Sequence, residues 1–442
     1  MNNLDLMQDL LRRARDAGAD AADAILIGGT SVSVSCRAGQ TEHLERSEAR
    51  DLGLRVFVGQ KAAVVSSTAV DPAGFQALAE RAVAMARVVP DDPHGGLAEL
   101  MAPPDRLTLD LDDAHEPDVA ALTTRASAAE AAARAVAGVT NSEGGSAGYG
   151  RTEVVLVTSA GFVGQYARTS HSVSATALAG AGTDMQRDYD YSGTVHLADL
   201  EDATEIGRHA GERAVRRLNP TRPKTARLPV VYDPRIATSL IGHLMGAING
   251  ASIVRGTSFL KNKLGQPVFG PGIFIHDEPR RVRGLRSRPF DAEGVPTRAK
   301  TIIDGGTLTT WLLDSRSARQ LGLASTGNAS RGTGGPPSPS PTNLYMEAGT
   351  ASPAELMSDI KEGLYVTELI GMGINGITGD YSRGAAGFMI RNGVLAEPVA
   401  EITIAGNLLE MFMHLTPAND LIFRHGTDAP TIRVEGLTLA GA

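Results

Sequence analysis

Residues 371–407 read GMGINGITGDYSRGAAGFMIRNGVLAEPVAEITIAGN, and this stretch decides the fold of the second half of the chain. Two apolar segments flank Asn392-Gly393, a pair typical of a two-residue β-hairpin turn of the primed type. The glycines on both sides of this turn indicate bulges and close backbone crossings, as in a closed sheet. We therefore predict a β-rich, barrel-like C-terminal domain.

Residues 233–250, DPRIATSLIGHLMGAING, predict a helix upstream of that sheet. Asp233-Pro234 is a helix-start signal, because proline fits the first turn of a helix. Gly250 is expected to follow its end, which places the helix at residues 234–249. His243 lies in its middle. Apolar residues recur at helical spacing and predict one buried face: Ile236, Leu240, Leu244 and Ala247.

The first half of the chain shows the alternation of half-buried strands. Val32 and Val34 alternate with serines, and a second alternating run spans residues 52–58. Helical patterns precede and follow these runs, so we expect an α+β fold with an N-terminal antiparallel sheet and flanking helices. Residues 218–229, LNPTRPKTARLP, lack apolar periodicity and are interpreted as a linker. The predicted domains are residues 1–219 and 220–442.

Composition excludes several classes of protein. The chain has 442 residues and a formal net charge of −8, which argues against a general nucleic-acid binder. We interpret the basic run Arg280–Arg288 as a solvated face or as intersubunit ion pairs. No apolar run reaches the ~20 residues of a membrane-spanning helix. The charged, amphipathic N-terminus is unlike a signal peptide, so a cytoplasmic protein without a membrane partner is expected.

Residues 20–90 and 225–440 resemble the TldD/PmbA family of metalloproteases, and the pattern from Gly379 to Asn407 carries the most specific match. In TldD-type subunits of that family, the helix at 234–249 carries His-Glu-x-x-x-His, which holds zinc. The aligned positions here begin with Thr238 and Ser239 and end with His243, so only the second histidine is present. This departure is the pattern of the PmbA (TldE) branch. TldD-type subunits also use a C-terminal cysteine, whereas the single cysteine here is Cys36.

The residues at these positions are poor matches to zinc chemistry. A catalytic zinc takes about three protein ligands from His, Asp, Glu or Cys and keeps a position open for water. The hydroxyl of Thr238 is a poor ligand, and Ser239 cannot act as a base near neutral pH. We therefore predict no catalytic residue, no metal and no cofactor in this chain, and interpret His243 as a packed interior histidine.

The resemblance implies a function that the composition does not. It implies that this chain supports the chamber of a TldD/TldE-type protease that cuts small unfolded peptides, while a TldD-type partner holds the zinc. The partner is a TldD-type subunit, or the chain itself in a homodimer. Asp380, Tyr381, Ser382 and Arg383 either hold an extended peptide in a groove or cap loops of the barrel.

Two alternative functions stay open at this point. The first is a homodimeric peptide-binding protein without protease activity. The second is a stand-alone metallopeptidase that uses His243 with His276, Asp277 or Glu278, although adjacent residues on a strand point to opposite sides. Gly371-x-Gly373-x-x-Gly376 matches a dinucleotide fingerprint, but no helical pattern follows it.

Two further motifs are interpreted as loops. Residues 144–148, GGSAG, match a nucleophile elbow, but a helix precedes them and strand-like residues follow, which is the reverse of the elbow's order. A glycine-rich loop is the better interpretation. Residues 331–341, RGTGGPPSPSP, are expected to form a flexible, surface-exposed stretch.

Overall fold

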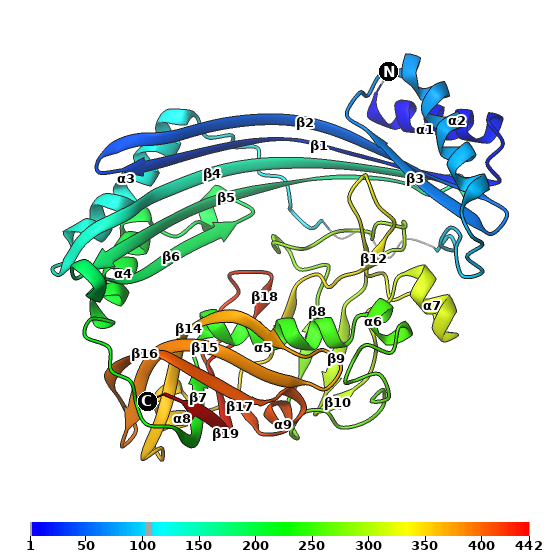
Figure 1. Ribbon diagram of the computed structural model, residues 1–442. Coiled ribbons are helices and arrows are strands. Elements are labelled where there is room, and N and C mark those ends of the chain that lie inside the picture. Colours follow the sequence, from blue (N-terminus) through cyan, green and yellow to red (C-terminus); the bar gives the residue numbers. More distant parts are fainter. Residues whose placement is uncertain (1, 102–107, 442) are drawn as a thin grey trace.

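The computed structural model describes residues 2–101 and 108–441. A long, curved sheet built from the first half of the chain arches over a C-terminal domain that contains a barrel (Figure 1). None of the helices in the described residues is long and apolar enough to cross a bilayer.

The N-terminal sheet has six strands in the order β3-β2-β1-β4-β5-β6, and every neighbouring pair is antiparallel. The pairing of β1 with β2 runs from Ala21↔Phe57 to Arg37↔Gln40. The structure thus confirms the predicted antiparallel sheet. Its strands are β1 (Ala21–Arg37), β2 (Gln40–Val58), β3 (Lys61–Ser67), β4 (Val139–Thr158), β5 (Val163–Ala179) and β6 (Gln186–Thr194).

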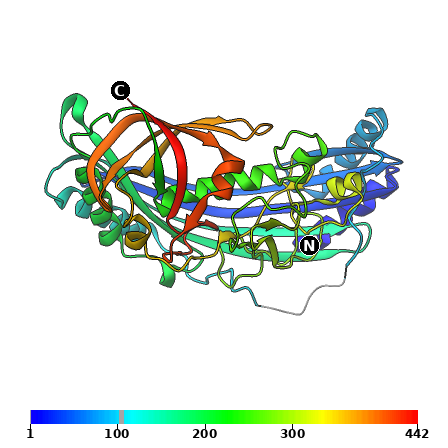
Figure 2. The same cartoon turned by 90° about the horizontal axis from the view of Figure 1, so that it is seen from below.

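Two helix pairs cover one face of this sheet at opposite ends. Ala24 and Leu26 of β1 pack against α1 (Asn3–Asp16) and α2 (Pro72–Val88), and Val34 packs against α3 (Val119–Ala135). Helix α4 (Ala203–Arg216) lies beside α3. Ile25 points to the other face and packs against Phe290 of the C-terminal domain, because side chains alternate along a strand. Figure 2 shows the C-terminal domain in front of the sheet between the two helix pairs.

The C-terminal domain contains a closed five-stranded barrel, as predicted. Strands β16, β15, β14, β7 and β19 are neighbours in that order, and pairing of β16 with β19 closes the ring. Arg391 pairs with Val394 across Asn392-Gly393, whose φ angles of 49° and 82° are those of a primed turn. The strands are β7 (Ala226–Tyr232), β14 (Glu362–Ile374), β15 (Asp380–Arg391), β16 (Val394–Asn407), β19 (Ile432–Ala440) and the added β17 (Leu415–Pro417).

Shorter elements complete this domain. One sheet has the order β10-β9-β8-β13-β18, with β8 (Ile275–Asp277), β9 (Lys300–Asp304), β10 (Thr307–Leu308), β13 (Leu344–Met346) and β18 (Thr427–Asp428); β11 (Ala329–Ser330) pairs with β12 (Ser338–Pro339). The helices are α5 (Pro234–Ala247), α6 (Gly250–Val254), α7 (Ser315–Leu321), α8 (Pro353–Met357) and α9 (Leu408–Met413).

Helix α5 ends earlier than the sequence suggested. It closes at Ala247, and Gly250 is the first residue of α6 instead of a terminator. The side chain of Asn249 accepts a hydrogen bond from the backbone N–H of Ala251 at 3.0 Å, so it caps a new helix at this point.

The expected flexible stretch at residues 331–341 is packed against the N-terminal sheet. The guanidinium of Arg331 is fully buried and pairs with Asp23 of β1. A Cβ on Gly53 of β2 would lie 2.3 Å from the carbonyl oxygen of Thr333, so the missing side chain is what allows this approach. The prediction of a flexible, surface-exposed segment therefore fails at Arg331 and Thr333, whereas Gly332, Gly334, Pro336 and Ser338 are exposed.

The structure also corrects two other predictions. Residues 144–148 lie inside β4, so they form neither a nucleophile elbow nor a loop. Glycine is needed there because a Cβ on Gly145 would lie 2.2 Å from the carbonyl oxygen of Ala126 in α3. The basic run Arg280–Arg288 is not only a solvated face, since Arg283 forms ion pairs with Asp110 and Asp199 of the N-terminal half within the same chain.

Candidate functional site

Helix α5 lies between the barrel and the N-terminal sheet and is anchored to both. Asp233 caps its start by accepting a hydrogen bond from the backbone N–H of Arg235 at 3.0 Å. Tyr365 of β14 donates its hydroxyl to Asp233 at 3.1 Å. The guanidinium of Arg235 donates to Asp188 of β6 at 2.9 Å. These contacts fix the rotation of the helix, so its two faces have defined surroundings.

One face of α5 belongs to the core of the C-terminal domain. Leu240, Leu244 and Ala247 of the predicted apolar face are buried, as expected from their spacing, and Ile236 is partly buried beside them. Ala237 and Ile241 complete this face. Burial of these side chains holds the helix against the barrel.

The other face of α5 carries a cluster of polar side chains. Ser239 and His243 are four residues apart and therefore share a side of the helix. The imidazole of His243 meets the ring of Tyr381 edge to face, with centroids 5.9 Å apart. Tyr232, the last residue of β7, is fully buried and influences the pKa of Tyr381. We call Tyr232, Ser239, His243 and Tyr381 the α5 cluster.

The α5 cluster holds buried polar atoms that form no well-aligned hydrogen bond. Oγ of Ser239 and Nε2 of His243 have no partner, whereas Oη of Tyr232 and Oη of Tyr381 lie close enough to interact with each other. A buried polar group without a partner costs free energy on the order of 1–3 kcal/mol, so native proteins rarely keep several together. Their concentration on one helix face marks this region as the candidate functional site.

The members of the cluster are uncharged near neutral pH, and burial moves the pKa values of His243 and of both tyrosines further from neutrality. Burial lowers the pKa of His243 to about 4, and the nearby positive charge of Arg383 adds to this. Burial also raises the pKa of Tyr381 to about 12 and that of Tyr232 well above its ordinary value. The cluster therefore offers neutral donors and acceptors and no anion.

This donor set does not fit a catalytic zinc ion. Thr238 lies outside the cluster, because its hydroxyl donates to the backbone carbonyl of Arg235 at 3.1 Å. Ser239 is neutral, and His243 is the only group in the cluster of a type that zinc commonly takes. Arg383 would in addition repel a cation.

Two residues considered as zinc ligands beside His243 form contacts with other side chains. His276 pairs with Glu347 at 2.7 Å, and Asp277 accepts hydrogen bonds from Asn328 and Thr342. Within residues 2–101 and 108–441, no three His, Cys, Asp or Glu side chains gather in a group that could hold a metal.

The structure divides the four residues predicted for a peptide groove between two faces of β15. Tyr381 and Arg383 point to the side of α5, where Arg383 lies close enough to influence His243. Asp380 and Ser382 are exposed on the other side, and Asp380 accepts a hydrogen bond from Thr378 at 2.6 Å. Sequence reasoning missed Tyr232, because a tyrosine at the end of a short apolar strand carries no signal of its own.

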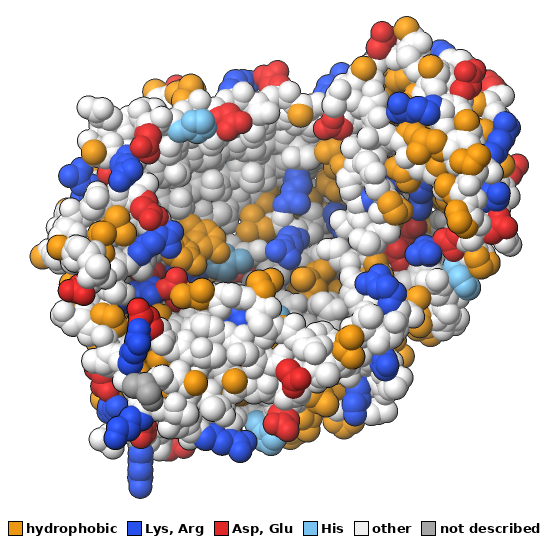
Figure 3. Space-filling view, in the orientation of Figure 1, with side chains coloured by type: hydrophobic (Ala, Val, Ile, Leu, Met, Phe, Trp, Pro, Cys, Tyr) orange, Lys and Arg blue, Asp and Glu red, His pale blue; other side chains and the backbone are white. Residues whose placement is uncertain are grey.

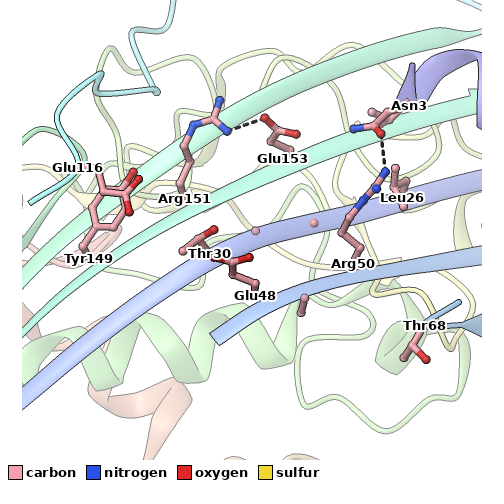
Figure 4. A pocket seen from close by; sticks show the side chains of 14 residues that line it. Asn3, Leu26, Thr30, Glu48, Arg50, Thr68, Glu116, Tyr149, Arg151 and Glu153 are labelled. Carbon is pink, nitrogen blue, oxygen red and sulfur yellow. Dashed lines mark hydrogen bonds and ion pairs between the residues drawn. The ribbon is translucent and has the colours of Figure 1, made fainter. Parts of the chain in front are cut away.

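A separate cavity of about 510 Å³ opens on the helix-covered face of the N-terminal sheet, between the two helix pairs (Figure 4). Its two arginines have partners: Arg151 pairs with Glu153 at 2.5 Å, and Arg50 donates a hydrogen bond to the amide oxygen of Asn3 at 2.5 Å. Among the described residues, none that lines this cavity holds a buried polar side-chain atom without a partner. We therefore assign no site to it.

The fold defines an α+β protein with a barrel in its C-terminal domain and a cluster of neutral, buried polar groups on helix α5. Sequence models of the PmbA/TldA metallopeptidase match three segments: domain 1 at residues 22–86, the central domain at residues 112–218 and the C-terminal domain at residues 225–441. The chain belongs to this PmbA/TldD family, and within it the chain is PmbA/TldE-like.

Individual relatives agree with this assignment. The chain is 37% identical to Metalloprotease PmbA of Escherichia coli O157:H7, over 96% of this chain and 93% of the relative. It is 34% identical to the Metalloprotease PmbA homolog of Haemophilus influenzae, over 97% and 94% of the two chains.

Solved structures share the fold over the full chain. A proposed modulator of DNA gyrase from Bacteroides thetaiotaomicron has a TM-score of 0.91 and 26% identity, and covers 100% of this chain and 99% of its own. TldE from Thermococcus kodakarensis has a TM-score of 0.89 and 21% identity, with coverage of 99% and 100%.

Proposed function

We propose that this chain is the PmbA/TldE-type subunit of a two-chain metalloprotease and holds no zinc itself. In this proposal a TldD-type chain supplies the zinc and the base, and the pair degrades or processes small unfolded peptides. The present chain completes the chamber in which the peptide lies. A homodimer that binds peptides without cutting them is the alternative assembly.

One observation carries the proposal. Helix α5 presents the hydroxyls of Thr238 and Ser239 where the sequence resemblance implies a ligand and a base, and His243 has no acidic or imidazole neighbour in the α5 cluster. A metal needs several charged or imidazole ligands at one point. The family membership supports a peptide as the substrate class, because the relatives are named metalloproteases.

Reconstitution tests the proposal directly. This chain and a TldD-type chain from the same genome are purified alone and mixed, and each sample is incubated with an unfolded peptide. We expect a stable complex on gel filtration and cleavage only in the mixture. Chelator-sensitive cleavage by this chain alone would contradict the proposal. Self-association and peptide binding, without complex formation or cleavage in the mixture, would favour the homodimeric alternative.

The proposal places this complex in the cytoplasm. Recovery of the chain with the membrane or secreted fraction of fractionated cells would contradict this placement.

A further inference from the structure

A second cavity, of about 550 Å³, lies between the uncovered face of the N-terminal sheet and loops of the C-terminal domain. The space-filling view shows a hollow between these two parts, with basic and hydrophobic side chains inside it (Figure 3). The cavity is within the size range of small-ligand sites. We call it the interdomain cavity.

One wall of the interdomain cavity is apolar. Ile25 and Leu156 of the sheet pack there against Phe290 of the C-terminal domain. The ring of Tyr166 meets Phe290 edge to face, with centroids 5.3 Å apart. This wall offers a surface for one apolar side chain of a ligand.

The opposite side of the cavity is basic. Four arginines line it, and two of them keep buried donors without a hydrogen-bond partner: Nε and Nη2 of Arg288, and Nε and Nη1 of Arg331. The side chain of Arg331 is 0% exposed, and its remaining nitrogen pairs with Asp23. The other two arginines have partners, since Arg168 donates to the carbonyl of Leu285 and Arg286 donates to Thr427.

Negative charge inside the cavity is scarce. Of the described residues that line it, Asp291 alone is acidic, and its oxygens accept hydrogen bonds from the backbone N–H groups of Glu293, Val295 and Ala329. Burial, with help from Glu293, raises the pKa of Asp291 to about 6. Burial also lowers the pKa of Arg168, and the neighbouring arginines add to this. Arg331 has Asp23 as its counter-ion, whereas no ion pair with an acidic side chain of the described residues is formed by Arg168, Arg286 or Arg288.

We propose that the interdomain cavity binds the C-terminal carboxylate of a peptide whose last side chain is apolar. Arg288 and Arg331 donate their free N–H groups to the carboxylate, and the wall of Ile25, Leu156 and Phe290 receives the side chain. A guanidinium and a carboxylate form strong, charge-assisted hydrogen bonds, and a buried site strengthens them. The choice of a peptide over another carboxylate rests on the function proposed above.

Peptide binding to the purified chain alone tests this inference by fluorescence anisotropy. The probes are an N-terminally labelled hexapeptide that ends in leucine with a free carboxylate, and the same peptide with a C-terminal amide. We expect the acid to bind at least about tenfold more tightly than the amide, a difference typical of one lost charge-assisted contact. Equal affinity for acid and amide would overturn the inference.

The variant Arg288→Gln isolates the arginine that keeps two free donors. It should weaken binding of the acid about tenfold and leave binding of the amide unchanged. Arg187→Gln removes one exposed arginine that pairs with Glu143 outside the cavity, and should change neither affinity. Thermal unfolding of both variants verifies that they fold. If Arg288→Gln folds and still prefers the acid by the full factor, the assignment of Arg288 is wrong.

A competition experiment separates a peptide carboxylate from a free phosphate. Inorganic phosphate at matched ionic strength should displace the acid peptide no better than chloride does. Phosphate binding that depends on Arg288, without a preference for the acid peptide, would overturn the inference in favour of a phosphate site.

Different experimental outcomes would contradict the carboxylate site and the proposed protease function. Equal binding of acid and amide, with cleavage intact in the two-chain mixture, contradicts the inference alone. Arg288-dependent binding of the acid peptide, without cleavage in that mixture, contradicts the proposed function alone.

Discussion

Two buried polar regions of this molecule differ in how their polar groups are paired. At the contact between the two domains, Asp23 accepts hydrogen bonds from Arg55 and Arg331, and Glu293 lies 3.7 Å from Arg55. Each of these four side chains has an opposite charge beside it. In the α5 cluster the groups are neutral, Oγ of Ser239 and Nε2 of His243 have no hydrogen-bond partner, and the hydroxyls of Tyr232 and Tyr381 form no well-aligned hydrogen bond.

This difference separates structural roles from functional ones. Charges that are desolvated must be paired, or the domains would not stay together. Neutral hydroxyls without a well-aligned hydrogen bond add little to the free energy of unfolding. The Asp23 network is therefore expected to be needed for folding, whereas the α5 cluster is expected to tolerate change. The predictions below follow this contrast.

The largest effect is expected at Asp23. The variant Asp23→Asn leaves Arg55 and Arg331 buried without their counter-charge, which should lower the free energy of unfolding by about 3–5 kcal/mol. Urea unfolding followed by circular dichroism measures this. Asp199→Asn removes an acid from an exposed ion pair with Arg283 and should cost less than about 1 kcal/mol. Equal losses of unfolding free energy in the two variants would show that the buried Asp23 network stabilises the fold no more than an exposed ion pair does.

A smaller, pH-dependent effect is expected at His243. Its folded pKa is lowered to about 4 by burial and by Arg383, while Tyr232 and Tyr381 stay uncharged. The unfolded chain therefore takes up the proton first, so this contribution to stability is present above about pH 6.5 and is lost as pH falls toward 4. Its size is at most about 3 kcal/mol.

The variant His243→Gln should remove this part of the pH dependence. Urea unfolding between these two pH values measures the slope, which should be shallower than in the unmodified chain. His43→Gln, at an exposed position, serves as the control and should leave the slope as it is. An unchanged slope in His243→Gln would show that the imidazole is not desolvated.

The smallest effect is expected from a matched pair of tyrosines. Tyr381→Phe removes a buried hydroxyl that lies near the hydroxyl of Tyr232 but forms no well-aligned hydrogen bond with it, so stability should change by less than about 1 kcal/mol or rise. Tyr365→Phe removes a hydroxyl that donates to Asp233 and should cost about 1.5–3 kcal/mol. Thermal and urea unfolding of both variants measure the difference. A larger loss in Tyr381→Phe than in Tyr365→Phe would mean that the α5 cluster is a structural hydrogen-bond network.

Local patterns predicted the elements of this fold well. The alternation at Val32 and Val34, the turn at Asn392-Gly393 and the start at Asp233-Pro234 each depend on a few neighbouring residues. Such features are set by backbone sterics and by the period of burial, both of which can be read along the chain. The end of α5 was missed, because the capping side chain of Asn249 outweighed the general preference of glycine for helix ends.

Contacts between residues far apart in the sequence could not be predicted from such local patterns. Asp23 and Arg331 meet although 308 positions separate them, and nothing in the composition of residues 331–341 distinguishes a packed segment from a mobile one. The candidate site was predicted only in part. His243 and Tyr381 were singled out for separate reasons, while their contact depends on how β15 crosses α5. Of the two arginines that keep unpartnered donors in the interdomain cavity, Arg288 belongs to the basic run, and Arg331 carried no sequence signal.

The metal content of the purified chain tests the central claim most directly. After equilibration with excess zinc and gel filtration, elemental analysis should find well below one zinc per chain, and His243→Ala should not change the value, because the α5 cluster lacks the ligands that zinc takes. One zinc per chain that His243→Ala removes would contradict the account.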